Sequence, residues 1–169
     1  VLLGQTGILF VGLMRGTTEA GIFGIAYRVS TLIAFGLNAI NSIAAPTIAE
    51  LHSQRQLNDL QRMLTLAALG LLAFSVPVFL GLVSFGKFIL SLFGPEFTDG
   101  YTALVILALG QLIHALAGPT GFLMTMTGHQ KKAGVILLIG LLLNVLLSLL
   151  LVPTLGMNGA AIATVISTL

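Results

Sequence analysis

Arg28 is the residue whose type and position most clearly suggest chemistry. It lies about two helical turns, roughly 10 Å, beyond Gly21, where an apolar stretch begins. A guanidinium inside a stretch that crosses a membrane is costly there and usually faces a cavity or a partner. Its planar fork pairs with two phosphate oxygens at once, so Arg28 is a candidate contact for an anionic substrate. The alternative is a side chain that extends outward to the lipid headgroups.

Two polar pairs have a spacing of three residues, which places both members on one helical face. Asn38 and Asn41 could line a polar cavity, and the more ordinary alternative is hydrogen bonding between helices. Gln111 and His114 form the second pair. A histidine in an apolar helix is a candidate relay or ligand contact, or else a packed, hydrogen-bonded residue. Asn144 has the same two interpretations.

Prolines inside apolar stretches mark candidate hinges. Gly118 and Pro119 interrupt one stretch, where proline removes a backbone hydrogen bond and a kink is expected. Broken helices in transporters often mark a substrate site or a hinge, and a static kink is the alternative. Pro77 and Pro46 give milder signals of the same kind.

Several kinds of site are missing from the sequence. It has no cysteine, and its histidines (His52, His114 and His129) lack metal-ligand spacing. It has no glycine-rich phosphate loop of the ATPase type. We therefore expect no enzyme activity, no catalytic or metal-binding residue and no cofactor. The net charge of +2 forms no basic tract, which argues against nucleic acid as a partner.

Composition identifies the environment that positions these residues. The chain is 57% hydrophobic and only 7% charged, whereas an average soluble domain is about a quarter charged. So few charges could not cover a water-facing surface. Charged residues separate apolar stretches of about 20 residues, which suits helices that cross a bilayer. Barrel strands are shorter and alternate polar with apolar residues, which these stretches do not.

The sequence therefore predicts an all-α membrane protein built as a polytopic helical bundle. We expect one membrane domain over residues 1–169, with four complete and two partial transmembrane helices at 1–15, 21–49, 62–86, 100–127, 133–152 and 157–169. The chain starts with Val1 and ends inside an apolar stretch, so we expect a fragment of a longer protein. Small residues (Gly4, Gly7, Gly12, Gly134 and Gly140) should let helices pack closely.

Loop charges predict the orientation. Residues 50–62 and 128–132 carry Arg55, Arg62, Lys131 and Lys132, whereas the opposite loops carry Arg15 and Lys87, so the first set should be cytoplasmic. The stretch from Glu50 to Leu64 is amphipathic and predicts an interfacial helix that leads into the next span, with partner docking as the alternative. The turn at residues 87–99 should lie on the outer surface, anchored by Phe93 and Phe97.

An ordered set of short motifs adds a family resemblance. The set comprises GIFGIAYR at 21–28, NAINS at 38–42, PTIAE at 46–50, LFGPEF at 92–97, LALGQ at 107–111, TGH at 127–129 and PTLGMNGAAIA at 153–163. It resembles the oligosaccharide flippase and polysaccharide transport families of the multidrug/oligosaccharidyl-lipid/polysaccharide exporter superfamily. The resemblance implies the second of two pseudo-symmetric six-helix lobes around a central cavity with alternating access. The N-terminal lobe would be missing from this chain.

The resemblance implies a transporter lobe that flips an undecaprenyl-pyrophosphate-linked oligosaccharide across the bacterial inner membrane for polysaccharide or O-antigen export. The lipid bilayer, the missing lobe and a coupling ion would be its partners. No Asp or Glu lies mid-span, which favours an anionic substrate over a drug cation. The alternatives are a multidrug cation antiporter, a peptidoglycan-precursor flippase, and a non-transporting scaffold for glycosyltransferases.

Overall fold

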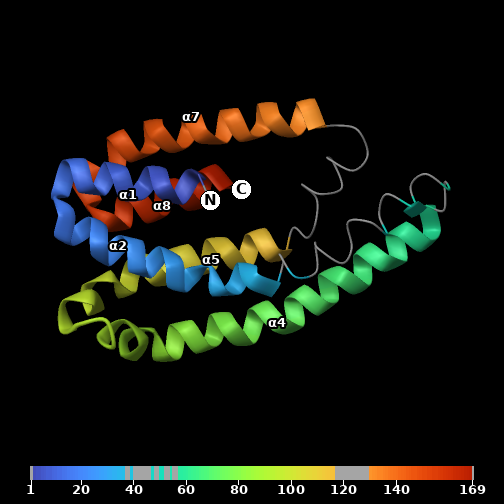
Figure 1. Ribbon diagram of the computed structural model, residues 1–169, viewed down its shortest axis with the longest axis horizontal. Helices are drawn as coiled ribbons and strands as arrows, with labels where there is room; N and C mark the ends of the chain where they lie inside the picture. Colours follow the sequence, from blue (N-terminus) through green and yellow to red (C-terminus); the bar gives the residue numbers. More distant parts are fainter. Residues whose placement is uncertain are drawn as a thin grey trace.

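The computed structural model describes residues 2–36, 57–116 and 130–168, together with residues 39, 47, 50, 51 and 54. Its named elements are all helices (Figure 1): α1 (Leu2–Arg15), α2 (Thr17–Ser30), α4 (Leu57–Ser91), the 3-10 helix η1 (Pro95–Gly100), α5 (Tyr101–Leu116), α7 (Gln130–Leu155) and α8 (Met157–Thr168). No strand occurs in this described part of the chain. The all-α prediction is confirmed.

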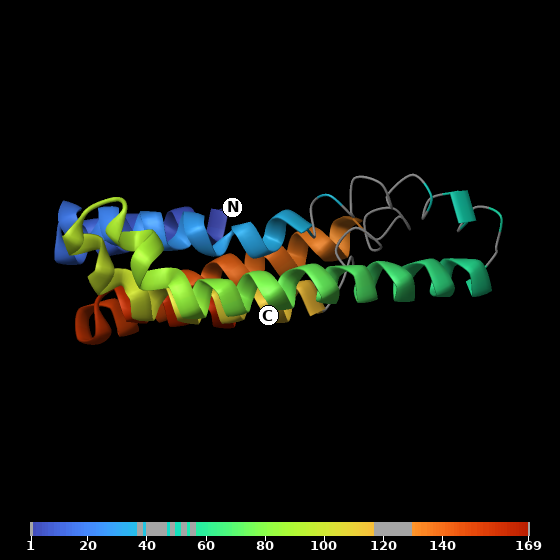
Figure 2. The same ribbon diagram turned by 90° about the horizontal axis from the view of Figure 1, so that it is seen from below.

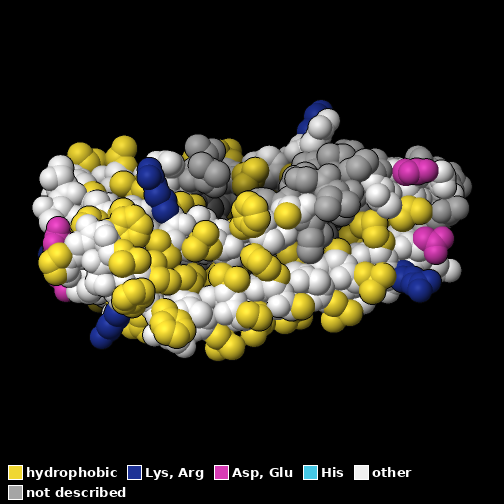
Figure 3. All heavy atoms as spheres, turned by 60° about the horizontal axis from the view of Figure 1, so that its bottom comes forward, with side chains coloured by type: hydrophobic (Ala, Val, Ile, Leu, Met, Phe, Trp, Pro, Cys, Tyr) yellow, Lys and Arg dark blue, Asp and Glu magenta, His cyan; other side chains and the backbone are white. Residues whose placement is uncertain are grey.

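Three helical segments are long and apolar enough to cross a membrane: Asn58–Ser91, Pro95–Leu116 and Gln130–Leu155. The bundle buries only 17% of the most apolar window of the first and of the last of these segments. The remaining surface is apolar and suits lipid rather than water. In the space-filling view, hydrophobic side chains cover the length of the molecule and acidic side chains lie at its two ends (Figure 3). The protein is an integral, multi-pass membrane protein.

Two helical hairpins and η1 meet at one end of the bundle, which we call the hairpin end (Figure 1). Gly16 separates α1 from α2 with a φ of 100°, and Gly156 separates α7 from α8 with a φ of 57°. Side chains other than glycine rarely adopt these left-handed conformations, so both turns depend on glycine. The turns at Arg15, at residues 87–99 and at Pro153 therefore lie on one side, as the alternation of loops requires.

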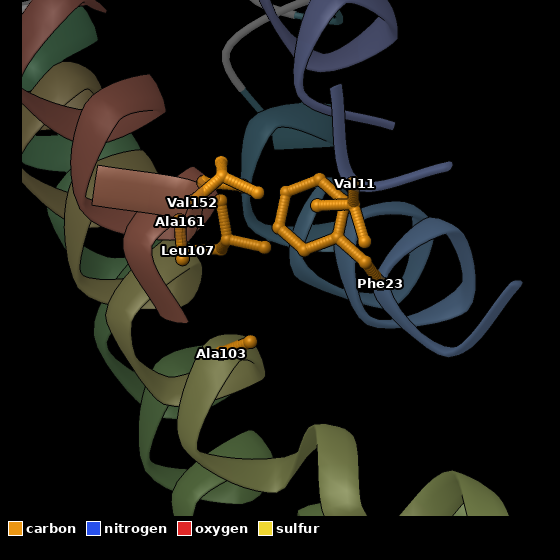
Figure 4. Close-up of a cluster of buried hydrophobic side chains, with 7 residues drawn as sticks. Val11, Phe23, Ala103, Leu107, Val152 and Ala161 are labelled. Atoms are coloured by element: carbon orange, nitrogen blue, oxygen red, sulfur yellow. The ribbon is translucent and has the colours of Figure 1, made fainter. Parts of the chain in front are cut away.

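The helices pack around α5 and α1. α5 contacts α2, α4 and α8, and α1 contacts α2, α7 and α8. Phe23 and Val11 from the first hairpin point toward Leu107, Val152 and Ala161 (Figure 4). Because lipid is as apolar as these side chains, close packing rather than exclusion of water holds such a contact together.

Glycines let the helices approach, as predicted for most of them. The ring of Tyr27 lies against Gly4, the ring of Phe23 against Gly7, and Ala20 against Gly12, while Gly140 contacts the backbone oxygen of Ser167. Gly134 makes no such approach to the described residues. A Cβ there would meet no described atom within 4 Å, because α7 turns that position outward.

α4 is one continuous helix of 35 residues through Pro77. At about 1.5 Å per residue it is roughly 52 Å long, more than the ~30 Å hydrocarbon core. It projects past the ends of α5 and α7 in both ribbon views (Figures 1 and 2). Near its start Leu60 is buried beside Leu51 and Leu64, whereas Asp59 is exposed. The amphipathic turn therefore continues directly into the span.

Candidate functional site: a cleft along α2

An open cleft of about 500 Å³ lies along α2. α2 forms its floor, and side chains from α1 and η1 form its walls. It is lined by Gln5, Ile8, Thr17, Ala20, Gly21, Gly24, Ile25, Arg28 and Phe97. Two consecutive helices and a 3-10 helix that is distant in the sequence therefore build one site.

The sequence of α2 explains why a cleft forms. Thr17, Gly21, Gly24 and Arg28 recur every three or four residues, so they share one helical face. Small side chains on this face leave the groove empty, and a Cβ at Gly21 would meet no described atom within 4 Å. From Thr17 to Arg28 the face is about 16 Å long. The cleft is thus an elongated groove with an arginine at the end away from the Gly16 turn.

Arg28 is the one charged residue among those that line this described cleft. It lies in the last turn of α2 and is exposed. Its guanidinium forms no hydrogen bond or ion pair with the described residues. The adjacent Tyr27 packs against Gly4 and fixes the helix that carries the arginine. The donors of Arg28 are therefore available to a ligand, in the bidentate geometry that a phosphate requires.

Arg15 shows the opposite use of an arginine. Its Nη2 donates to the backbone oxygen of Pro153 at 3.0 Å, and its Nε donates to that of Val152 at 3.4 Å. These carbonyls belong to the last turn of α7, where a cation is favourable. Arg15 therefore ties the first hairpin to the second. Its loop position in the sequence did not reveal this role.

The structure describes two further substrate-pathway candidates, and neither of them lines the cleft. Gln111 and His114 are half-buried in the last two turns of α5, and neither lines the cleft beside Arg28. Asn38, Asn41, Pro46, Gly118 and Pro119 lie outside the described residues. The pathway and hinge roles of all these residues, and of Pro77, stay predictions.

Sequence reasoning missed three cleft residues, Gln5, Thr17 and Phe97. For Thr17 the sequence did carry a signal, because its i, i+4 spacing from Gly21 places both residues on the same face of α2. Phe97 was expected to anchor the η1 turn in the headgroup region together with Phe93. Instead Phe97 is half-buried, packs against the core around Leu104 and lines the cleft, while Phe93 is exposed.

A second polar region is buried between α7 and α8. Asn144 Nδ2 donates to Ser167 Oγ at 2.9 Å, and Thr164 Oγ1 donates to the backbone oxygen of Ala160 at 2.8 Å. Asn144 Oδ1 and Ser148 Oγ are buried and have no hydrogen-bond partner among the described residues. No group of three His, Cys, Asp or Glu residues able to hold a metal occurs in the described ranges. The hydrogen bond from Asn144 in α7 to Ser167 in α8 therefore favours a role in helix packing.

Comparison with known proteins identifies the family. A family profile described as MatE matches residues 1–150. The chain belongs to the MatE family. Membership agrees with the exporter superfamily that the motif order resembles. All the described residues that line the cleft fall inside the match, as does the turn at Gly16, whereas the turn at Gly156 lies just beyond it.

Two similar proteins come from Haloferax volcanii. The "Probable flippase AglR" is 31% identical over 167 residues, which cover 94% of this chain and 34% of that protein. The "Probable low-salt glycan biosynthesis flippase Agl15" is 25% identical over 164 residues, covering 95% of this chain and 34% of that protein. The MatE chain therefore spans about a third of the length of these relatives. No solved structure matches it.

Proposed function

We propose that this chain is a lobe of a flippase for lipid-linked oligosaccharides and that Arg28 binds the substrate's phosphate. The relatives' printed names, both flippases and one assigned to glycan biosynthesis, support the class of activity. A transporter role also fits the family better than catalysis. The single structural observation that carries the proposal is an arginine at the end of an open groove that pairs with none of the described residues.

The groove suits a substrate with one anionic group and many hydroxyls. Arg28 supplies a bidentate cation for the phosphate. Gln5 and Thr17 supply neutral hydrogen-bonding groups for sugar hydroxyls, and both are exposed. The small residues of α2 leave space for the sugar rings of such a substrate. A second lobe of the same protein would complete the site by closing over the open side.

The finer form of the proposal concerns carrier and compartment. We propose an undecaprenyl-pyrophosphate carrier and the bacterial inner membrane, with polysaccharide or O-antigen export as the role. We also propose that a coupling ion drives transport and that an N-terminal lobe completes the transporter. Residues 50–62 and 128–132 would lie in the cytoplasm. The two relatives come from an archaeon, so an archaeal membrane and its own glycan carrier are the alternative setting.

The cleft disfavours a cation antiporter. Among its described lining residues the charge is positive and no carboxylate is present. A drug cation would be repelled there rather than bound. A peptidoglycan-precursor flippase shares the lipid-linked phosphate and stays compatible with the same chemistry. A scaffold for glycosyltransferases would not need an open groove with an arginine that pairs with none of the described residues.

The test is transport by variants of the full-length protein in liposomes, with a labelled lipid-linked oligosaccharide and an organic cation as separate substrates. Arg28→Ala should lower oligosaccharide flipping at least about ten-fold, because a charge-assisted bidentate contact is lost. Arg28→Lys should retain part of the activity. Arg62→Gln, which removes an exposed arginine near the start of α4, is the control and should be neutral. Full flipping by a well-folded Arg28→Ala variant would refute the role of Arg28.

A further inference from the structure

An exposed lysine lies at the hairpin end of α4, among exposed apolar residues of the same stretch of sequence. Lys87 is exposed, and large hydrophobic side chains near it in sequence are exposed too: Phe85 64%, Phe88 64%, Leu92 70% and Phe93 53%. α4 packs on α5, η1 and α2 through its other face. The exposed face therefore points out of the bundle. Aromatic side chains beside a cation at the end of a membrane helix are typical of the headgroup region.

Lys87 is held in place instead of being free to move. Its Nζ lies 5.3 Å from the centre of the Tyr101 ring, a cation–π arrangement. Tyr101 is fixed in turn, because its hydroxyl donates to the backbone oxygen of Val83 at 2.8 Å. Gly86 lets the ring lie close, since a Cβ there would be 3.2 Å from Tyr101 Cε2. The ring thus favours one position of the ammonium, beside the start of α5.

The charge of Lys87 is not neutralised within the described part of the chain. Its one recorded interaction is with the Tyr101 ring, and no described carboxylate pairs with it. Glu96 of η1 lies over Gly94 instead, with Oε1 3.1 Å from the position of a Cβ there. The ammonium has three N–H donors. The face of an aromatic ring does not satisfy these donors as oxygen acceptors do. The described part of the chain therefore supplies no oxygen to these donors, and a ligand can supply it.

We propose that Lys87 binds the phosphate of an anionic phospholipid in the headgroup layer. Ser84 is exposed one turn away on the same helical face and can donate to the same phosphate. The rings of Phe85 and Phe88 contact the first carbons of the acyl chains. Ser91 takes no part, because its hydroxyl donates to the backbone oxygen of Phe88 at 2.7 Å. This site is separate from the cleft and does not depend on the flippase proposal.

The occupant follows from the chemistry of the site. A single phosphate with attached acyl chains matches a pinned ammonium beside exposed phenyl rings. A zwitterionic phospholipid carries its own cation next to the phosphate and gains less from Lys87. We therefore expect a preference for an anionic headgroup of about five-fold for the one lysine.

Native mass spectrometry of the full-length protein tests the preference, with phosphatidylglycerol titrated against phosphatidylcholine. The wild type should bind more phosphatidylglycerol than phosphatidylcholine. In Lys87→Gln the ratio of the two bound lipids should fall about five-fold, and in Lys87→Arg it should stay as in the wild type. Lys131→Gln is the matched control, because Lys131 is an exposed lysine in the first turn of α7, the end of that helix away from Gly156. Equal loss in both variants, or none in Lys87→Gln, overturns the proposal.

Photo-crosslinking locates the lipid independently of stability. p-Benzoylphenylalanine at position 88 should crosslink to phosphatidylglycerol in membranes, and Lys87→Gln in that background should reduce the yield about five-fold. The same crosslinker at Leu142, which is exposed mid-way along α7, should show no dependence on Lys87. Crosslinking at position 88 that is insensitive to Lys87 would mean that only general lipid contact occurs there.

Discussion

The cleft face of α2 and the contact between α7 and α8 are both rich in glycine, yet glycine does opposite things in the two places. At Gly21 a Cβ would meet no described atom within 4 Å, so the missing side chain leaves space open. At Gly159 a Cβ would collide with the backbone oxygen of Leu151. The first glycine keeps a groove accessible, and the second lets two helices touch through their backbones.

The polar residues of the two regions differ in the same way. Arg28 is exposed in the cleft without a described partner, whereas Asn144 is fully buried and donates to Ser167. Under the proposed function, polarity inside a membrane helix serves a ligand in the cleft, whereas between α7 and α8 it serves a helix partner. Substitutions should separate these uses: changes in the cleft should affect transport, and changes between α7 and α8 should affect stability.

The largest effect is expected for Gly159→Ala. The added Cβ meets rigid backbone rather than a flexible side chain, so the α7–α8 hairpin must open. We expect a loss of about 2–3 kcal/mol in the free energy of unfolding, the upper range for overpacking. Denaturant titration in detergent measures it. Gly21→Ala is the control and should change stability by less than about 0.5 kcal/mol. Equal loss in both variants would contradict the comparison.

The second largest effect is expected from a substitution that fills the cleft. Gly21→Trp places an indole in the groove without meeting a described neighbour at Cβ. We expect flipping to fall about ten-fold, which corresponds to roughly 1.4 kcal/mol, with little change in unfolding. Transport in liposomes and thermal unfolding of the same preparation measure the two effects. Leu142→Trp, on the exposed face of α7, should leave both unchanged. Normal flipping by Gly21→Trp would show that the substrate does not use this groove.

The contrast also shows what the sequence could predict. Charge spacing predicts the membrane helices, because hydrocarbon excludes charged residues over a fixed length. The depth of Arg28 in its stretch predicts an exposed or cavity-facing guanidinium. Phe97 reaches the cleft from a different segment, and Gln111 does not line it, since both depend on how α5 and η1 pack against α2. Spacing within one helix cannot give the rotation of that helix against its neighbours.

Asn144→Ala should have a smaller effect on stability and none on transport. It removes the hydrogen bond to Ser167 but also removes an oxygen that lacks a partner. We expect a cost of about 0.5–1 kcal/mol, the usual range for such bonds between membrane helices. Ser167→Ala should cost about the same, and the double variant should show that the two losses overlap. Loss of flipping with unchanged stability would instead make this region a second functional site.

Arg15→Gln should give the smallest effect. The glutamine can still donate to one carbonyl of α7, at Val152 or Pro153, but the favourable charge at the helix C-terminus is lost. That charge is worth about 0.3–1 kcal/mol at an exposed helix end. Arg15→Lys keeps the charge and should recover most of the loss, and high salt should shrink the difference between the two variants. The contact ties the two hairpins at their turns, so its loss should lower the free energy of unfolding. Denaturant titration at low and high salt measures that free energy. A cost for Arg15→Gln above that of Gly159→Ala would mean that this tie, rather than backbone packing, holds the hairpins together.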